Sequence, residues 1–108
     1  MDRHALYSWK KDLESREDLT SLYHHKKLVV CFHDQKDSWY VSFQDGTIAV
    51  LDSVDRKADI TVEANDEIIN SLILGGGKLT SMPNELVSVS GSYKDLLFLE
   101  SILYLSNS

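Results

Sequence analysis

The sequence predicts an α+β fold in which helices cover a largely antiparallel sheet, with the element order αββββαβα. Apolar residues first recur at the helical period of about 3.6 and then, from Leu28, at the strand period of 2. The helical period returns after the fourth strand and again after Gly91. A length of 108 residues with 43% hydrophobic and 26% charged residues is typical of one globular domain, and we expect residues 1–108 to form it.

Residues 1–27 form the predicted N-terminal helical segment, and residues 28–105 the sheet with its covering helices. Apolar residues recur at helical spacing over residues 6–13 and again over residues 19–23. The polar gap between these stretches predicts two short helices or one bent helix. We expect the helical segment to end near Lys26 and Lys27, because cations stabilise a helix C-terminus.

Four strands are expected in a row, at residues 28–33, 39–44, 48–50 and 58–62. The first three show a period of two residues and are rich in β-branched and aromatic residues. Asp45 and Gly46 provide a strong signal for a tight hairpin turn.

A helix is expected after the fourth strand, because Asn65 or Asp66 can cap it and Ile68 and Leu72 lie on its apolar stripe. We expect the three glycines at 75–77 to end it. Residues 86–90 then alternate again, which predicts a fifth strand that ends at Gly91.

The last helix is expected to run from a cap at Ser92 to about Leu105. Its apolar residues surround most of the helix axis, and one sheet face cannot cover them all: Leu96, Leu97, Phe98, Leu99, Ile102, Leu103, Tyr104 and Leu105. Three arrangements would cover them. In the first, the helix would pack between the sheet and the N-terminal helix. In the second it would form an oligomer interface, and in the third it would line a cavity that holds an apolar ligand.

We expect no catalytic site, no metal site and no cofactor. His24 and His25 are adjacent, so on a helix their side chains point roughly 100° apart and cannot easily share a metal ion. Cys31 has no base beside it in the sequence. The glycines at 75–77 and Lys78 follow a helix and lack the spacing of a phosphate-binding loop.

The net charge of −6 argues against nucleic acid as a partner and disfavours anionic headgroups over the surface as a whole. Cys31 is the single cysteine, as expected in a reducing compartment, and we expect a cytoplasmic location. The longest apolar runs are far shorter than the roughly 18 residues of a membrane-spanning helix, so no transmembrane segment is expected.

Several blocks together resemble the sterol carrier protein 2 (SCP2) domain family, in a small stand-alone member of the prokaryotic type. They are WYVSFQDG at 39–46, KADITV at 57–62 and VSVSG at 87–91. A helix through Leu72 that closes at Gly75 lies between the last two. Each block is unspecific, but the ordered set with its spacing is distinctive.

The resemblance implies a five-stranded sheet covered on one face by helices, enclosing a hydrophobic tunnel for fatty acids, acyl chains or sterols. It also implies a non-enzymatic lipid-binding carrier whose last helix closes the tunnel. On this basis we expect seven apolar residues to line the cavity: Ile48, Val50, Ile68, Leu72, Leu97, Phe98 and Ile102.

Two other functions remain open. In the first, the domain would be a structural or dimerisation module without ligand that forms a homodimer through its C-terminal helix. In the second, it would present a lipid as an accessory subunit of a biosynthetic enzyme system, as in quinone biosynthesis. Residues 82–85 read Met-Pro-Asn-Glu where the family usually has a second glycine–lysine pair. The resemblance therefore does not identify the ligand.

Overall fold

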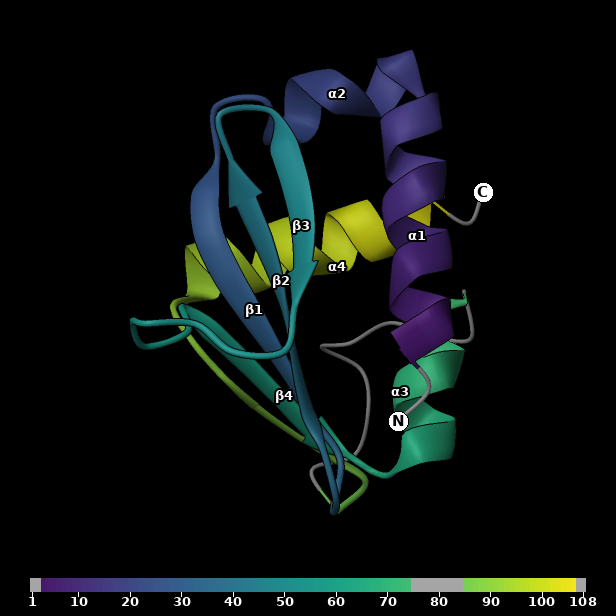
Figure 1. The fold of residues 1–108 in the computed structure, drawn as a ribbon, viewed down its shortest axis with the longest axis vertical. Coiled ribbons are helices and arrows are strands. Elements are labelled where there is room, and N and C mark those ends of the chain that lie inside the picture. Colours follow the sequence, from purple (N-terminus) through teal and green to yellow (C-terminus); the bar gives the residue numbers. More distant parts are fainter. Residues whose placement is uncertain (1–2, 75–84, 107–108) are drawn as a thin grey trace.

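The computed structural model describes residues 3–74 and 85–106, and its elements follow the predicted order (Figure 1). The N-terminal segment forms two helices, α1 (Arg3–Ser15) and α2 (Glu17–Tyr23), with Arg16 in extended conformation between them. The expected end near Lys26 and Lys27 is wrong. Helix α2 ends at Tyr23 with no basic residue in its last turn, because strand β1 (Lys27–His33) already begins at Lys27.

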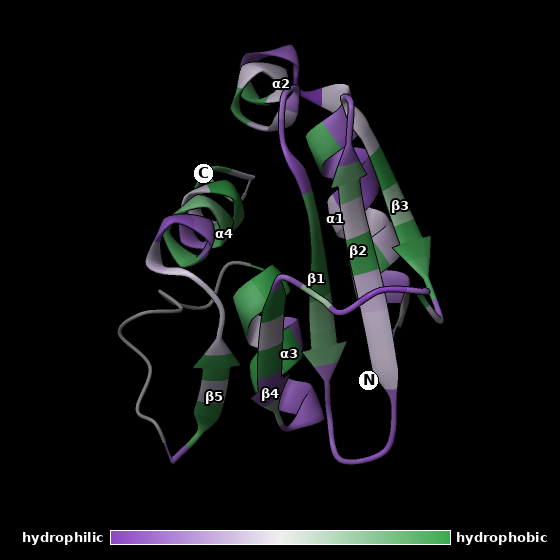
Figure 2. Cartoon of the chain, turned by 90° about the vertical axis from the view of Figure 1, so that its left-hand side faces the viewer, coloured by the Kyte–Doolittle hydropathy of each residue, from purple (hydrophilic) through white to green (hydrophobic). Residues whose placement is uncertain are grey.

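The five strands form one mixed sheet in the order β3-β2-β1-β4-β5. Three of its four pairings are antiparallel, and the pairing of β1 with β4 is parallel. The loop at 52–59 joins β3 to β4 by crossing β1 and β2 on the side of the sheet opposite α1 and α3 (Figure 2). Besides β1, the strands are β2 (Ser38–Gln44), β3 (Thr47–Leu51), β4 (Ile60–Ala64) and β5 (Val87–Ser90).

Strand β4 begins two residues later than the sequence pattern predicts. The backbone N–H of Asp59 donates to the carbonyl of Val29 at 2.8 Å. The N–H of Val29 donates to the Asp59 carboxylate, also at 2.8 Å. A side chain thus takes the place of a backbone acceptor, and the regular ladder starts at Ile60.

The predicted turn and both predicted helix caps are present. Asp45 and Gly46 have φ values of 51° and 81°, the two positive angles that a tight hairpin turn of this kind requires. Asn65 Oδ1 accepts the N–H of Ile68 at 2.9 Å and caps α3 (Asp66–Ile73). Ser92 Oγ accepts the N–H of Asp95 at 3.2 Å, at the start of α4 (Tyr93–Ser106). The expected helix stop at 75–77 lies outside the described residues.

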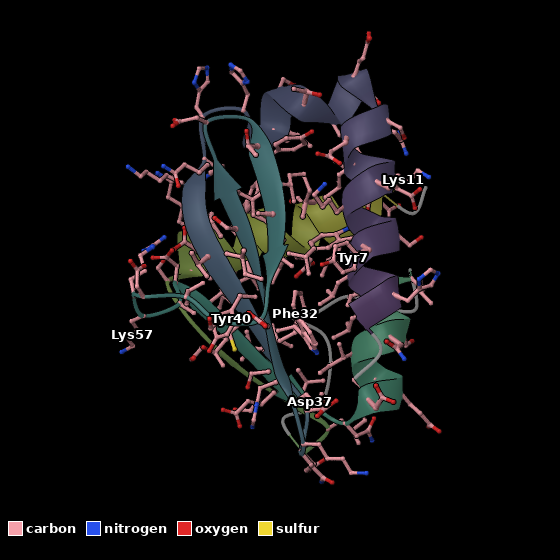
Figure 3. The ribbon with its side chains drawn as sticks, in the orientation of Figure 1. Tyr7, Lys11, Phe32, Asp37, Tyr40 and Lys57 are labelled. Carbon is pink, nitrogen blue, oxygen red and sulfur yellow. The ribbon has the colours of Figure 1, made fainter. Side chains whose placement is uncertain are left out.

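The core lies between one face of the sheet, here called the inner face, and helices α1, α3 and α4. Trp9 on α1 meets Phe32 and Phe43 edge-on, with ring centroids 6.3 and 6.2 Å apart. The opposite, outer face of the sheet carries Tyr40, which lies across the sheet from Phe32 (Figure 3). The sheet therefore has two faces of different kinds. The inner face is hydrophobic and covered by helices, and the outer face carries Tyr40 on the side away from those helices.

Candidate functional site

The inner side of α4 closes the core. Leu99, Ile102 and Leu103 are at most 3% exposed and belong to the main apolar cluster. Packing against the sheet and the N-terminal helices, the first of the three arrangements considered above, thus covers this side of the helix. Tyr93 and Tyr104 lie on the other side and are mostly exposed.

The C-terminal end of α4 is held by polar contacts. Trp9 Nε1 donates to Ser106 Oγ at 2.9 Å, and this hydroxyl donates to the carbonyl of Leu103 at 3.1 Å. Arg16 Nη1 donates to the carbonyl of Leu105 at 3.0 Å. The last carbonyls of a helix have no partner within the helix, so these contacts satisfy groups that would otherwise need water.

The N-terminal half of α4 is held differently. The ring of Phe98 meets Phe43 edge-on, with centroids 5.5 Å apart, and Lys26 Nζ lies 5.0 Å from the centre of the Phe98 ring. Ring packing and a cation above an aromatic face are less directional than the buried hydrogen bonds at the other end. Phe98 therefore lies where the apolar interior meets a cation near the surface.

Six of the seven predicted lining residues lie around this one core. Ile48, Leu72 and Ile102 are buried within it, and Val50, Ile68 and Phe98 are partly buried against it. Leu97 is 43% exposed and lies on the outer side of α4. A cavity bounded by these residues stays a prediction.

An open pocket of about 360 Å³ lies where β1, β4 and β5 approach the start of α3. Ile68 and Leu86 contribute apolar surface to it, and His33, Glu63 and Ser88 contribute polar groups. The predicted lining residue Ile68 thus also borders a polar surface pocket.

The described residues show no assembled catalytic or metal chemistry. Cys31 is buried, and burial raises the pKa of its thiol above the ordinary value, so the reactive thiolate is disfavoured. Within residues 3–74 and 85–106, no three histidine, cysteine, aspartate or glutamate side chains gather in a way that suits a metal ion. No helix in this part of the chain combines the length and apolar character needed to cross a membrane.

The helix-covered five-stranded sheet and the apolar interior closed by α4 agree with a sequence comparison. The model of the SCP-2 sterol transfer family matches residues 4–103. The chain belongs to the SCP-2 sterol transfer family. Comparison with curated protein sequences gives no match.

Solved structures of the SCP-2 type share this fold. A protein described as "UbiJ-SCP2 Ubiquinone synthesis protein" has 17% identity and a TM-score of 0.74, covering 93% of each chain. The sterol carrier protein domain 2 of Helicoverpa armigera has 14% identity and a TM-score of 0.76, covering 94% of this chain and 84% of its own. The inverting sec-alkylsulfatase Pisa1 from Pseudomonas sp. matches 77% of this chain with 14% of its own, at 17% identity and a TM-score of 0.64.

The contacts that hold α4 were not predicted from the sequence. Arg16 and Leu105 are separated by 89 positions, and Trp9 and Ser106 by 97. Local periodicity carries no signal for such pairs. Trp9 does lie on the predicted apolar stripe of the first helix, but nothing in its neighbourhood indicates that its indole N–H needs a partner.

Proposed function

We propose that this SCP-2 family chain is a cytoplasmic, non-enzymatic carrier that holds an acyl chain, a sterol-like molecule or another apolar molecule in an internal cavity. The cavity lies against the inner side of α4, with Phe98 and Ile102 in its wall. The family match over residues 4–103 is the observation that carries this proposal.

The composition of the interior supports an apolar ligand. Aromatic residues from α1, the sheet and α4 meet there, with Phe43 in edge contact with both Trp9 and Phe98. Among the described residues, Asp34 and Ser106 are the buried polar ones, and neither has a positive charge. Because an unpaired carboxylate is costly to bury, the enclosed part of the ligand is uncharged and any acidic headgroup stays near the surface.

The direct test is native mass spectrometry of the protein purified from its own cells, followed by binding of a fluorescent fatty acid to the delipidated protein. A retained apolar molecule and saturable binding support the carrier. A protein that is free of ligand and binds no fluorescent fatty acid contradicts it.

A variant of Ile102 locates the ligand. If Ile102 borders a cavity, Ile102→Trp fills space otherwise occupied by ligand, so fatty-acid binding is lost while the denaturation midpoint stays the same. In a fully packed core the same change costs about 1–3 kcal/mol in overpacking, and the midpoint falls. Tyr104→Trp is the matched control, because Tyr104 is 63% exposed on the same helix and should affect neither measurement.

A second role, in which the domain presents an apolar substrate to a biosynthetic enzyme, is favoured by the similarity to the ubiquinone synthesis protein over 93% of both chains. This role requires that the retained molecule be a prenylated aromatic precursor, which the same mass measurement identifies. A ligand-free homodimer joined through α4 would instead support the structural module.

A further inference from the structure

The start of α4 is fixed to the sheet through Gly91. This residue has a φ of 144°, and a Cβ atom there would lie 2.8 Å from the carbonyl oxygen of Asp59 and 3.3 Å from Cα of Ile60. The backbone thus passes directly against the start of β4, where there is no room for a side chain. The helix begins immediately afterwards, with its cap at Ser92. The backbone itself therefore holds this end of α4 in place.

The last turn of α4 is held by side chains from a distant part of the chain. Arg16 Nη1 donates to the carbonyl of Leu105 at 3.0 Å, and Trp9 Nε1 donates to Ser106 Oγ at 2.9 Å. Figure 1 shows α4 running behind the strands towards α1, the helix that carries Trp9. Hydrogen bonds weaken steeply once their angle falls below about 120°, so a small displacement of the last turn breaks both contacts.

Arg16 is positioned for its contact with α4 by Asp18. Arg16 Nη2 donates to Asp18 Oδ2 at 2.8 Å, and Arg16 Nε donates to Oδ1 at 3.3 Å. Two parallel bonds of this kind fix the plane of the guanidinium group, and Nη1 then reaches Leu105. The Arg16 side chain is 31% exposed, so water can reach the guanidinium group when the bond to Leu105 opens. The contact is therefore specific in geometry and easily reversed.

We propose that Arg16 is a latch on the last turn of α4, and that opening of this latch sets the rate at which the apolar ligand enters and leaves. The inference rests on the proposed carrier function. Leu103 lies in this part of the helix and is 3% exposed, so displacement of the last turn uncovers the apolar interior beside Trp9. The start of α4 stays on the sheet at Gly91, which makes it the pivot of the movement.

A latch of this kind changes the rates of binding but not the affinity. The closed arrangement contains the bond between Arg16 and Leu105 both with and without ligand, so loss of the bond destabilises the two closed states equally. The open population then rises by the same factor in the free and in the loaded protein. The association and dissociation rate constants therefore rise together, and Kd, which is their ratio, stays the same. A residue that touches the ligand would change Kd instead.

Stopped-flow binding of a fluorescent fatty acid to the delipidated full chain tests the proposal. Arg16→Gln should raise both rate constants about tenfold, the factor that one hydrogen bond from a charged donor contributes, and should change Kd less than about twofold. Arg16→Lys keeps the charge but loses the planar fork that Asp18 holds, so an intermediate increase is expected. Lys10→Gln is the matched control, because Lys10 pairs with Glu14 within α1 at 2.9 Å, and it should leave both rates unchanged.

Amide hydrogen exchange tests the latch without any ligand. The end of a helix frays once it loses its tertiary contacts, so the amides of residues 102–106 should exchange about tenfold faster in Arg16→Gln than in the parent chain. Asp59→Ala removes a contact at the start of β4, away from the last turn of α4. It should accelerate the amides of β1, which exchange by global unfolding, and leave residues 102–106 unchanged, because these exchange by local opening.

Three results would overturn the latch. They are parent-like binding rates in Arg16→Gln, a faster dissociation in this variant with an unchanged association rate, and equal acceleration of residues 102–106 in Asp59→Ala and Arg16→Gln. The second result would place Arg16 at the ligand, and the third would show that the last turn opens only when the whole domain unfolds. A chain that binds no fatty acid contradicts the carrier function alone, because hydrogen exchange measures the latch without ligand.

Discussion

The two faces of strand β1 are both buried, yet they are buried by different means. Leu28, Val30 and Phe32 face α1, α3 and α4 and belong to the main apolar cluster. Val29 and Cys31 alternate with them on the outer face and are 4% and 6% exposed, but they lie outside that cluster. Burial of a residue therefore does not by itself show that it belongs to the core.

The covering material explains the difference. On the inner face, β1 meets the aromatic rings and branched side chains of three helices. On the outer face, Val29 is paired with Ser42 beside the loop at 52–59, and Cys31 is paired with Tyr40 and Thr61. A thin layer of small and polar side chains relaxes more easily after a substitution than a close-packed core does, so equal burial should give unequal energetic cost.

The largest effect is expected on the inner face of β2. Phe43 is 1% exposed and its ring touches Trp9, Tyr23 and Phe98. Phe43→Ala should lower the free energy of unfolding by about 3–5 kcal/mol, since it leaves a cavity among rings that cannot collapse.

Tyr40→Ala on the outer face of the same strand is the control and should cost about 1 kcal/mol. Both values come from urea denaturation followed by tryptophan fluorescence. Equal costs for the two variants would show that the outer layer is packed as closely as the core.

A closer comparison uses two adjacent valines of β1. Val30 and Val29 have the same side chain and are 0% and 4% exposed, but they face opposite sides of the sheet. Val30→Ala should cost about 2–3 kcal/mol and Val29→Ala about 1 kcal/mol, measured by the same denaturation. A larger cost at Val29 would contradict the thin-layer interpretation.

The outer face also has a polar component, at the start of β4. The Asp59 carboxylate accepts the N–H of Val29 at 2.8 Å and that of Arg56 Nη2 at 2.9 Å. Asp59→Ala leaves the Val29 N–H without this acceptor and should cost about 1–3 kcal/mol. Asp59→Asn keeps a side-chain oxygen there and should cost less, as measured by thermal denaturation. If both variants are neutral, water replaces the carboxylate and the contact is not structural.

The features predicted correctly from the sequence are those with local signals. The hairpin turn at Asp45 and Gly46 requires two positive φ angles, and the caps at Asn65 and Ser92 use side chains three residues from their partners. The apolar period then identified every strand and helix of the described residues, with errors at the ends. Helix α2 ended early and β4 began late because contacts between separate segments decided those boundaries: strand β1 already pairs with β2 from Lys27, and the Asp59 carboxylate takes the place of a ladder acceptor.

The candidate site was less predictable because it depends on contacts between distant segments. The apolar composition of α4 showed that the helix needs cover on more than one side, but it did not show which side stays open. Six of the predicted lining residues lie in or against the core, whereas Leu97 lies on the exposed side of α4. Which residues bound a cavity depends on packing to within a methylene group, and periodicity has no such resolution.

The smallest effect is expected at Cys31, and it tests whether the thin outer layer excludes solvent. Burial raises the pKa of the Cys31 thiol and the charge of Glu63 adds to this rise, although hydrogen bonds with Tyr40 and Ser38 oppose it. At pH 8 a smaller fraction of native molecules than of unfolded molecules therefore has the thiolate, so a disulfide reagent should react slowly until denaturant is added. Cys31→Ser should change the free energy of unfolding by less than about 1 kcal/mol, because the neighbouring hydroxyls can bond to the new one. Equally fast reaction in the native and denatured states would show that the outer layer is open to solvent, and the contrast between the two faces of β1 would then have to rest on the valine pair alone.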